Sequence, residues 1–95
     1  MKVVLSGLAY QTLEGGGLFQ SERPDIRAAF HGQRAGFGWR MSAQLSAADA
    51  RTLLRALEAY ARAFSGPGLD ADDAQSRRDG AACARDAKRL RAALD

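Results

Sequence analysis

A change in the spacing of hydrophobic residues at the Leu45–Ser46 junction constrains the fold of this 95-residue chain more than any other feature. Between Phe37 and Leu45 the apolar residues occupy alternate positions, whereas from Ala50 to Phe64 they recur at helical spacing. Alternation places side chains on opposite faces of a strand, and a period near 3.6 places them along one face of a helix. The pattern therefore predicts a strand that runs directly into a helix.

Two further strands are expected before this junction. The segment Lys2–Tyr10 predicts a first strand with apolar side chains on both faces. The segment Gln11–Arg23 contains three consecutive glycines and predicts a flexible connection, from which Leu18 and Phe19 pack back onto the core. A proline then opens a second strand over Asp25–His31, because proline is tolerated at the first residue of a strand.

The second and third strands are expected to form a hairpin with its loop at Arg34–Ala35 or over the wider Gln33–Gly36. The apolar cross-strand pairs in this register are Phe30 with Trp39, Ala28 with Met41, and Ile26 with Ala43. A shift by one residue would turn Arg27 and Arg40 toward the core, so the hydrophobic pattern specifies the register.

Two helices are expected after the junction. Ser46 is a suitable N-cap, and Asp49 adds a favourable negative charge in the first turn. The stripe expected to cover the apolar sheet face consists of Leu53, Leu54, Leu57, Tyr60 and Phe64. Ser65–Gly68 ends this helix, and the second helix begins within the acidic Leu69–Gln75 or at Ser76. Its mostly small stripe is Cys83, Ala84, Ala87, Leu90 and Leu94, and Gly80 weakens the helix by about 1 kcal/mol relative to alanine.

These elements predict the α+β class: a small antiparallel sheet of about three strands, followed by two C-terminal helices packed on one of its faces. The length indicates a single small domain over residues 1–95. Within it, residues 1–45 form the sheet region and residues 46–95 the helical region. A connection rich in Gly, Pro and Asp near residues 65–75 divides the helical region.

The amino-acid composition predicts the kind of source organism and the cellular location of the protein. Arg, Ala and Gly are abundant, as GC-rich codons would produce, so we expect a high-GC bacterium or its phage as the source. A single cysteine allows no intrachain disulfide and favours a reducing, cytoplasmic location. No run of apolar residues is long enough to cross a membrane.

The residues needed for catalysis are scarce. The chain has one histidine, His31, and one cysteine, Cys83, and nothing in their spacing brings them together. A nucleophile needs a base within hydrogen-bond reach, and a metal site needs several ligands at suitable spacing. We therefore expect neither an enzyme nor a bound cofactor or metal.

Residues Trp39–Ser46, followed by two helices, resemble a ribbon-helix-helix segment. In that family the outward strand residues read the DNA major groove from an intertwined dimer. The resemblance implies that Arg40, Ser42 and Gln44 would be the reading residues. The chain departs from the family in its 38-residue N-terminal segment and in its long connection between the helices, so it is not assigned to it.

The uncovered sheet face is the expected binding surface. The candidate residues on it and at the hairpin end are Arg27, His31, Arg34, Arg40, Ser42 and Gln44. The formal net charge of +3, with twelve arginines among 14 basic residues, suits an acidic or nucleic-acid-facing partner. We expect a small non-enzymatic binding protein that acts through protein contact, such as an inhibitor or adaptor of a larger nucleic-acid-handling complex, for instance a defence system. Direct nucleic-acid binding through the same face is the alternative, and the oligomeric state stays open.

Overall fold

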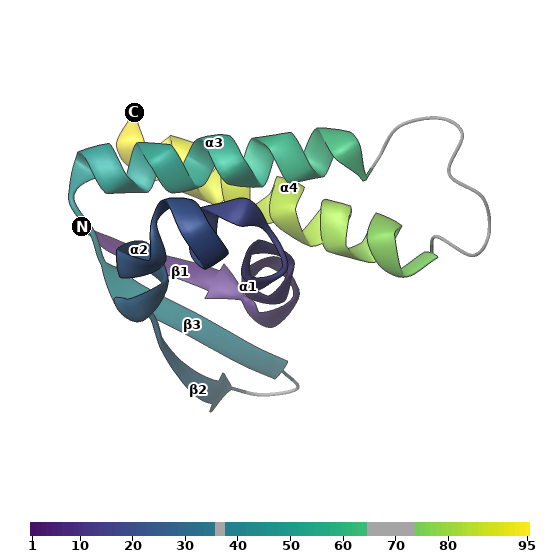
Figure 1. The fold of residues 1–95 in the computed structure, drawn as a ribbon, viewed down its shortest axis with the longest axis horizontal. Helices are drawn as coiled ribbons and strands as arrows, with labels where there is room; N and C mark the ends of the chain where they lie inside the picture. Colours follow the sequence, from purple (N-terminus) through teal and green to yellow (C-terminus); the bar gives the residue numbers. More distant parts are fainter. Residues whose placement is uncertain (36–37, 65–73) are drawn as a thin grey trace.

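A computed structural model describes residues 1–35, 38–64 and 74–95 of the chain (Figure 1). Its three strands, β1 (Lys2–Ser6), β2 (His31–Ala35) and β3 (Gly38–Gln44), form an antiparallel sheet in the order β1-β3-β2. The helical elements are α1 (Gly7–Glu14), the π-helical turn η1 (Leu18–Glu22), α2 (Pro24–Ala28), α3 (Ala47–Ala63) and α4 (Ala74–Leu94). The expected α+β class, with helices packed on the sheet, is confirmed.

The sheet has one covered face and one open face. Val3 and Leu5 of β1 lie opposite Ala43 and Met41 of β3, and these four residues face the core. The helices lie on this side of the sheet (Figure 1), where α4 contacts both α1 and β1. Because β3 pairs on both edges with strands of its own chain, it is not free to form the two-chain ribbon of ribbon-helix-helix proteins.

The first strand is shorter than expected. It ends at Ser6 rather than at Tyr10, and α1 begins at the next residue. The Ser6 hydroxyl accepts a hydrogen bond from the Ala9 amide at 3.3 Å, which is the geometry of an N-cap. Ala9 and Leu13 are buried one helical turn apart. Part of the apolar run that predicted a long strand therefore belongs to helix α1. The strand prediction is wrong for residues 7–10.

The segment Gln11–Arg23 is structured, contrary to the expected flexible connection. It contains the end of α1 and the turn η1, and Leu18 and Phe19 are buried in the core as expected. A Cβ atom at Gly16 would overlap the Tyr60 hydroxyl of α3. The glycine therefore allows close approach between two elements.

The expected second strand over Asp25–His31 is also wrong, because Pro24–Ala28 form helix α2. Proline suits the first turn of a helix as well as the start of a strand, since the amide proton it lacks would have no helical partner there. Ile26 and Phe30 are buried from this segment, and Phe30 packs against Phe19 with ring centroids 6.1 Å apart.

The hairpin exists, but its register differs from the expected one by four residues. β2 begins only at His31, which lies opposite Ser42, and Arg34 lies opposite Trp39. None of the three expected apolar pairs forms, since Ile26 and Ala28 are helical and Phe30 precedes the strand. Arg34 and Ala35 belong to β2, and the residues between β2 and β3 lie outside the described part.

The junction after β3 follows the expectation. The Ser46 hydroxyl accepts a hydrogen bond from the Asp49 amide at 3.1 Å, and α3 buries Leu53, Leu54 and Leu57. This stripe packs mainly against α4 rather than against the sheet. Among the described residues, no helix combines the length and apolar content that a membrane span needs.

Helix α4 is already helical at Ala74, where the described residues resume, so the expected alternative start at Ser76 is wrong. Residues 65–73, which include the rest of the expected starting region at 69–73, lie outside the described residues. Cys83, Ala87 and Leu90 are buried as expected. Ala84 is exposed instead, so the expected stripe is one residue too broad.

Candidate interaction surface

The outer face of the sheet gathers side chains from all three strands. The pairs Lys2 with Gln44, Val4 with Ser42, and His31 with Ser42 share this face, because directly opposed residues project to the same side. We call this surface the open sheet face; its described members are Lys2, Val4, His31, Arg40, Ser42 and Gln44. All are exposed except Ser42, which is half-buried.

The charge of the open sheet face is one-sided. It carries Lys2 and Arg40 together with His31, and its described members include no carboxylate. Within the described part of the chain, no hydrogen bond or ion pair engages the Arg40 guanidinium. Several other arginines are held by carboxylates of the chain itself: Arg23, Arg27, Arg89 and Arg91. Arg40 is therefore available to a partner.

Trp39 precedes Arg40 in β3, but it lies on the opposite side of the strand, next to the start of α1, and so outside the open sheet face. The residue is 58% exposed, the largest fraction among the exposed large hydrophobic residues described. β1 ends at Ser6 opposite Arg40, so the strand has no residue opposite Trp39. A Cβ at Gly7 would lie 3.3 Å from the Trp39 Cβ, which places the base of the indole side chain against the start of α1.

Sequence patterning gave the wrong environment for Trp39. Alternation correctly puts it on the other side of β3 from Arg40, but the expected partner Phe30 is buried elsewhere. A first strand that ends at Ser6 is too short to cover Trp39, and this would have predicted its exposure. The sequence did not indicate it, because the first strand was expected to continue to Tyr10.

Two of the predicted site residues lie elsewhere. Arg27 is on α2, not on a strand, and its guanidinium donates to a Glu14 carboxylate oxygen at 2.6 Å. This hydrogen bond with Glu14 raises the pKa of Arg27. Arg34 lies in β2 opposite Trp39, at a position that alternates with the His31 face. The structure thus brings together His31, Arg40, Ser42 and Gln44, and it separates Arg27 from them.

The candidate nucleophile and the histidine occupy different environments. Cys83 is fully buried on α4, and the loss of water around it raises the pKa of its thiol to about 11. The thiol is therefore protonated near neutral pH. His31 is exposed on the open sheet face. Among the described residues no three His, Cys, Asp or Glu side chains cluster in a way that could hold a metal ion.

Comparison with known proteins gives no relative. No protein-family model, curated protein or solved structure matches this chain. Its function is therefore inferred from the chemistry of its own surfaces.

Proposed function

We propose that this chain is a non-enzymatic protein-binding module that docks through the open sheet face onto an acidic surface of a larger protein. The observation that carries the proposal is an exposed Arg40 to which no described residue bonds, on a face whose described members include no carboxylate. Arginine is among the residues that most often anchor protein interfaces, because its side chain buries a large area and makes directed contacts. The cationic face favours an acidic partner, since complementary charge speeds encounter and sets orientation.

The rest of the face supports a protein partner. Val4 is 37% exposed and lies opposite Ser42, while Lys2 and Gln44 lie at the end of the same two strands. An apolar centre bordered by polar and charged side chains is the usual composition of a protein interface. In its more specific form, the proposal is an inhibitor or adaptor of a larger nucleic-acid-handling complex in a bacterium or phage, which the arginine content of the chain supports.

Direct nucleic-acid binding is the competing function. It would gain from a long row of cations, but Arg51, Arg55 and Arg62 lie on α3, which packs on α4 on the covered side of the sheet (Figure 1). They do not extend the open sheet face. A surface that carries only two fixed cations among its described members is better matched to an acidic protein patch than to a phosphate backbone.

The test compares the wild-type chain with Arg40→Glu, uses Arg51→Glu as the matched charge control, and uses Trp39→Ala as a control on the opposite side of β3. Arg51 is also an exposed arginine, so its reversal changes the net charge equally while leaving the sheet intact. Each protein is used to capture partners from a high-GC bacterial lysate. The affinity of the purified partner is then measured by calorimetry.

We expect Arg40→Glu to weaken binding of the partner by about tenfold or more, as hot-spot substitutions do. Arg51→Glu and Trp39→Ala should bind nearly as the wild type does. A partner that Arg40→Glu binds with unchanged affinity contradicts the proposed surface. Fluorescence anisotropy with labelled DNA and RNA across a salt series covers the alternative. Binding that falls steeply with salt and is lost in Arg40→Glu would assign the face to nucleic acid.

A further inference from the structure

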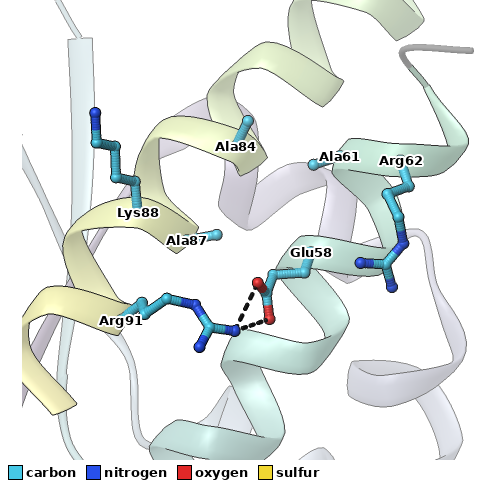
Figure 2. A pocket seen from close by; sticks show the side chains of 7 residues that line it. All are labelled: Glu58, Ala61, Arg62, Ala84, Ala87, Lys88 and Arg91. Atoms are coloured by element: carbon cyan, nitrogen blue, oxygen red, sulfur yellow. Dashed lines mark hydrogen bonds and ion pairs between the residues drawn. The ribbon is translucent and has the colours of Figure 1, made fainter. Parts of the chain in front are cut away.

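A second surface lies between the two long helices. α3 and α4 enclose an open groove of about 340 Å³ on the helical side of the molecule (Figure 2). The groove is lined by residues of these two helices alone, so it does not share a residue with the open sheet face. It is therefore a separate candidate for recognition.

The floor of the groove is made of alanines. Ala61 of α3 and Ala84 and Ala87 of α4 lie between the two helices in Figure 2. Beyond this floor the helices approach so closely that a Cβ at Gly80 would lie 2.7 Å from the Phe64 Cβ. Methyl side chains leave a shallow apolar channel into which the ridge of another helix can pack.

Positive charge borders the alanine floor. Arg62 on α3 and Lys88 on α4 are both exposed, and neither bonds to a described residue of the chain. Glu58 is the only carboxylate among the lining residues, and both of its oxygens accept from Arg91 at 2.8 Å. The negative charge of Glu58 is thus already paired with Arg91 within the groove. Any occupant therefore encounters two unpaired cations beside an apolar floor.

We propose that the α3–α4 groove binds an acidic amphipathic helix of a partner protein. Small apolar side chains of that helix lie on the alanine floor, and carboxylates on its flanks pair with Arg62 and Lys88. The apolar floor favours a protein helix over nucleic acid, whose phosphates gain nothing from contact with methyl groups. The proposal goes beyond the open sheet face, because a chain with two separate surfaces can hold two proteins at once.

The experiment titrates the isotope-labelled full chain with a synthetic helical peptide and follows the backbone amide signals by NMR. The peptide carries alanine and leucine along one face and glutamate on both flanks. A peptide of the same composition in scrambled order and a DNA duplex serve as comparison probes. The variants are Arg62→Glu combined with Lys88→Glu, and Ala84→Gln, which alters the exposed floor without changing charge. Arg85→Glu, an exposed α4 residue outside the groove lining, is the matched control.

We expect the amphipathic peptide to shift the signals of residues 58–62 and 84–91. Both groove variants should weaken its binding, the charge reversal by about tenfold or more, while Arg85→Glu has little effect. The scrambled peptide should bind more weakly.

Three results would overturn the proposal. The first is the absence of shifts in the groove at millimolar peptide. The second is equal binding of the scrambled peptide, or no effect of Ala84→Gln, which would reduce the groove to a non-specific anion site. The third is tighter binding of the DNA duplex to the same residues, which would assign the groove to nucleic acid. None of these measurements involves the open sheet face, so the two proposals fail independently.

Discussion

Individual side chains acquire their chemistry from where the fold places them, and Cys83 is an example. Its thiol is fully enclosed by the core on α4, where the thiolate would lose the water that stabilises it. Its pKa therefore rises to about 11 from an ordinary value near 9. Arg40 is the opposite case, because its guanidinium is exposed and none of the described residues bonds to it.

The raised pKa of Cys83 predicts a loss of stability at alkaline pH. Between about pH 9 and pH 11 the unfolded chain releases the thiol proton, whereas the folded chain keeps it. The free energy of unfolding should therefore fall as pH rises through this window. Urea unfolding of the wild type and of Cys83→Ala, each at pH 8 and pH 11, measures it.

The Cys83→Ala variant separates the thiol from the tyrosines and lysines that also titrate in this range. Its stability should fall less between the two pH values than that of the wild type. Equal losses in the two proteins would show that the thiol contributes nothing to the alkaline destabilisation.

At the scale of elements, the contact between α3 and α4 explains a glycine that disfavours its own helix. Gly80 is buried inside α4, and an added Cβ would meet the Phe64 Cβ at 2.7 Å and the Phe64 carbonyl group at 3.3 Å. The helix pair gains close approach at the expense of helix propensity. The local sequence indicated only the unfavourable propensity.

Gly80→Ala should therefore destabilise the protein, although alanine is the better helix former by about 1 kcal/mol. We expect a net loss of roughly 1–3 kcal/mol, because overpacking forces the two helices apart. Gly15→Ala is the matched control: Gly15 already has right-handed helical backbone angles, and its added Cβ would meet nothing closer than 3.6 Å. Urea denaturation followed by circular dichroism compares them, and a Gly80→Ala protein as stable as Gly15→Ala would contradict the packing argument.

At the scale of the whole molecule, a buried carboxylate joins the first strand to the last helix. Asp86 of α4 is 3% exposed and accepts hydrogen bonds from the Ser6 amide at 2.8 Å and the Ser6 hydroxyl at 2.9 Å. Arg89 also donates to it. These contacts span 80 residues of sequence, so they form only when both ends of the chain are in place.

Asp86→Ala should cost roughly 3 kcal/mol of stability, because it leaves the donors of Ser6 unsatisfied at the point where β1 becomes α1. Arg89→Ala is the control, since it removes one partner of the carboxylate but keeps both bonds from Ser6. The Arg89 side chain is 56% exposed, so its loss should matter much less. Chemical denaturation measures both variants, and equal stability losses would place the effect in the ion pair rather than in the link to Ser6.

The features that could be predicted from the sequence alone are those with local causes. The alternation along β3, the helical period of α3 and the Ser46 cap between them each depend on neighbouring residues. Alternation also places Arg40, Ser42 and Gln44 together on one face of β3 without knowledge of the partners of that strand.

The N-terminal half and the sheet register depend on long-range packing. α1 and α2 contain 8 and 5 residues, too few for intrinsic propensity to specify a helix. They are stabilised instead by burial of Ala9, Leu13 and Ile26 in the common core. With Pro24–Ala28 helical, β2 could begin only at His31, and this moved Arg27 away from the sheet and left Trp39 exposed. Long-range packing provides the free energy that stabilises the two short helices and the sheet register, and no local sequence pattern predicts it.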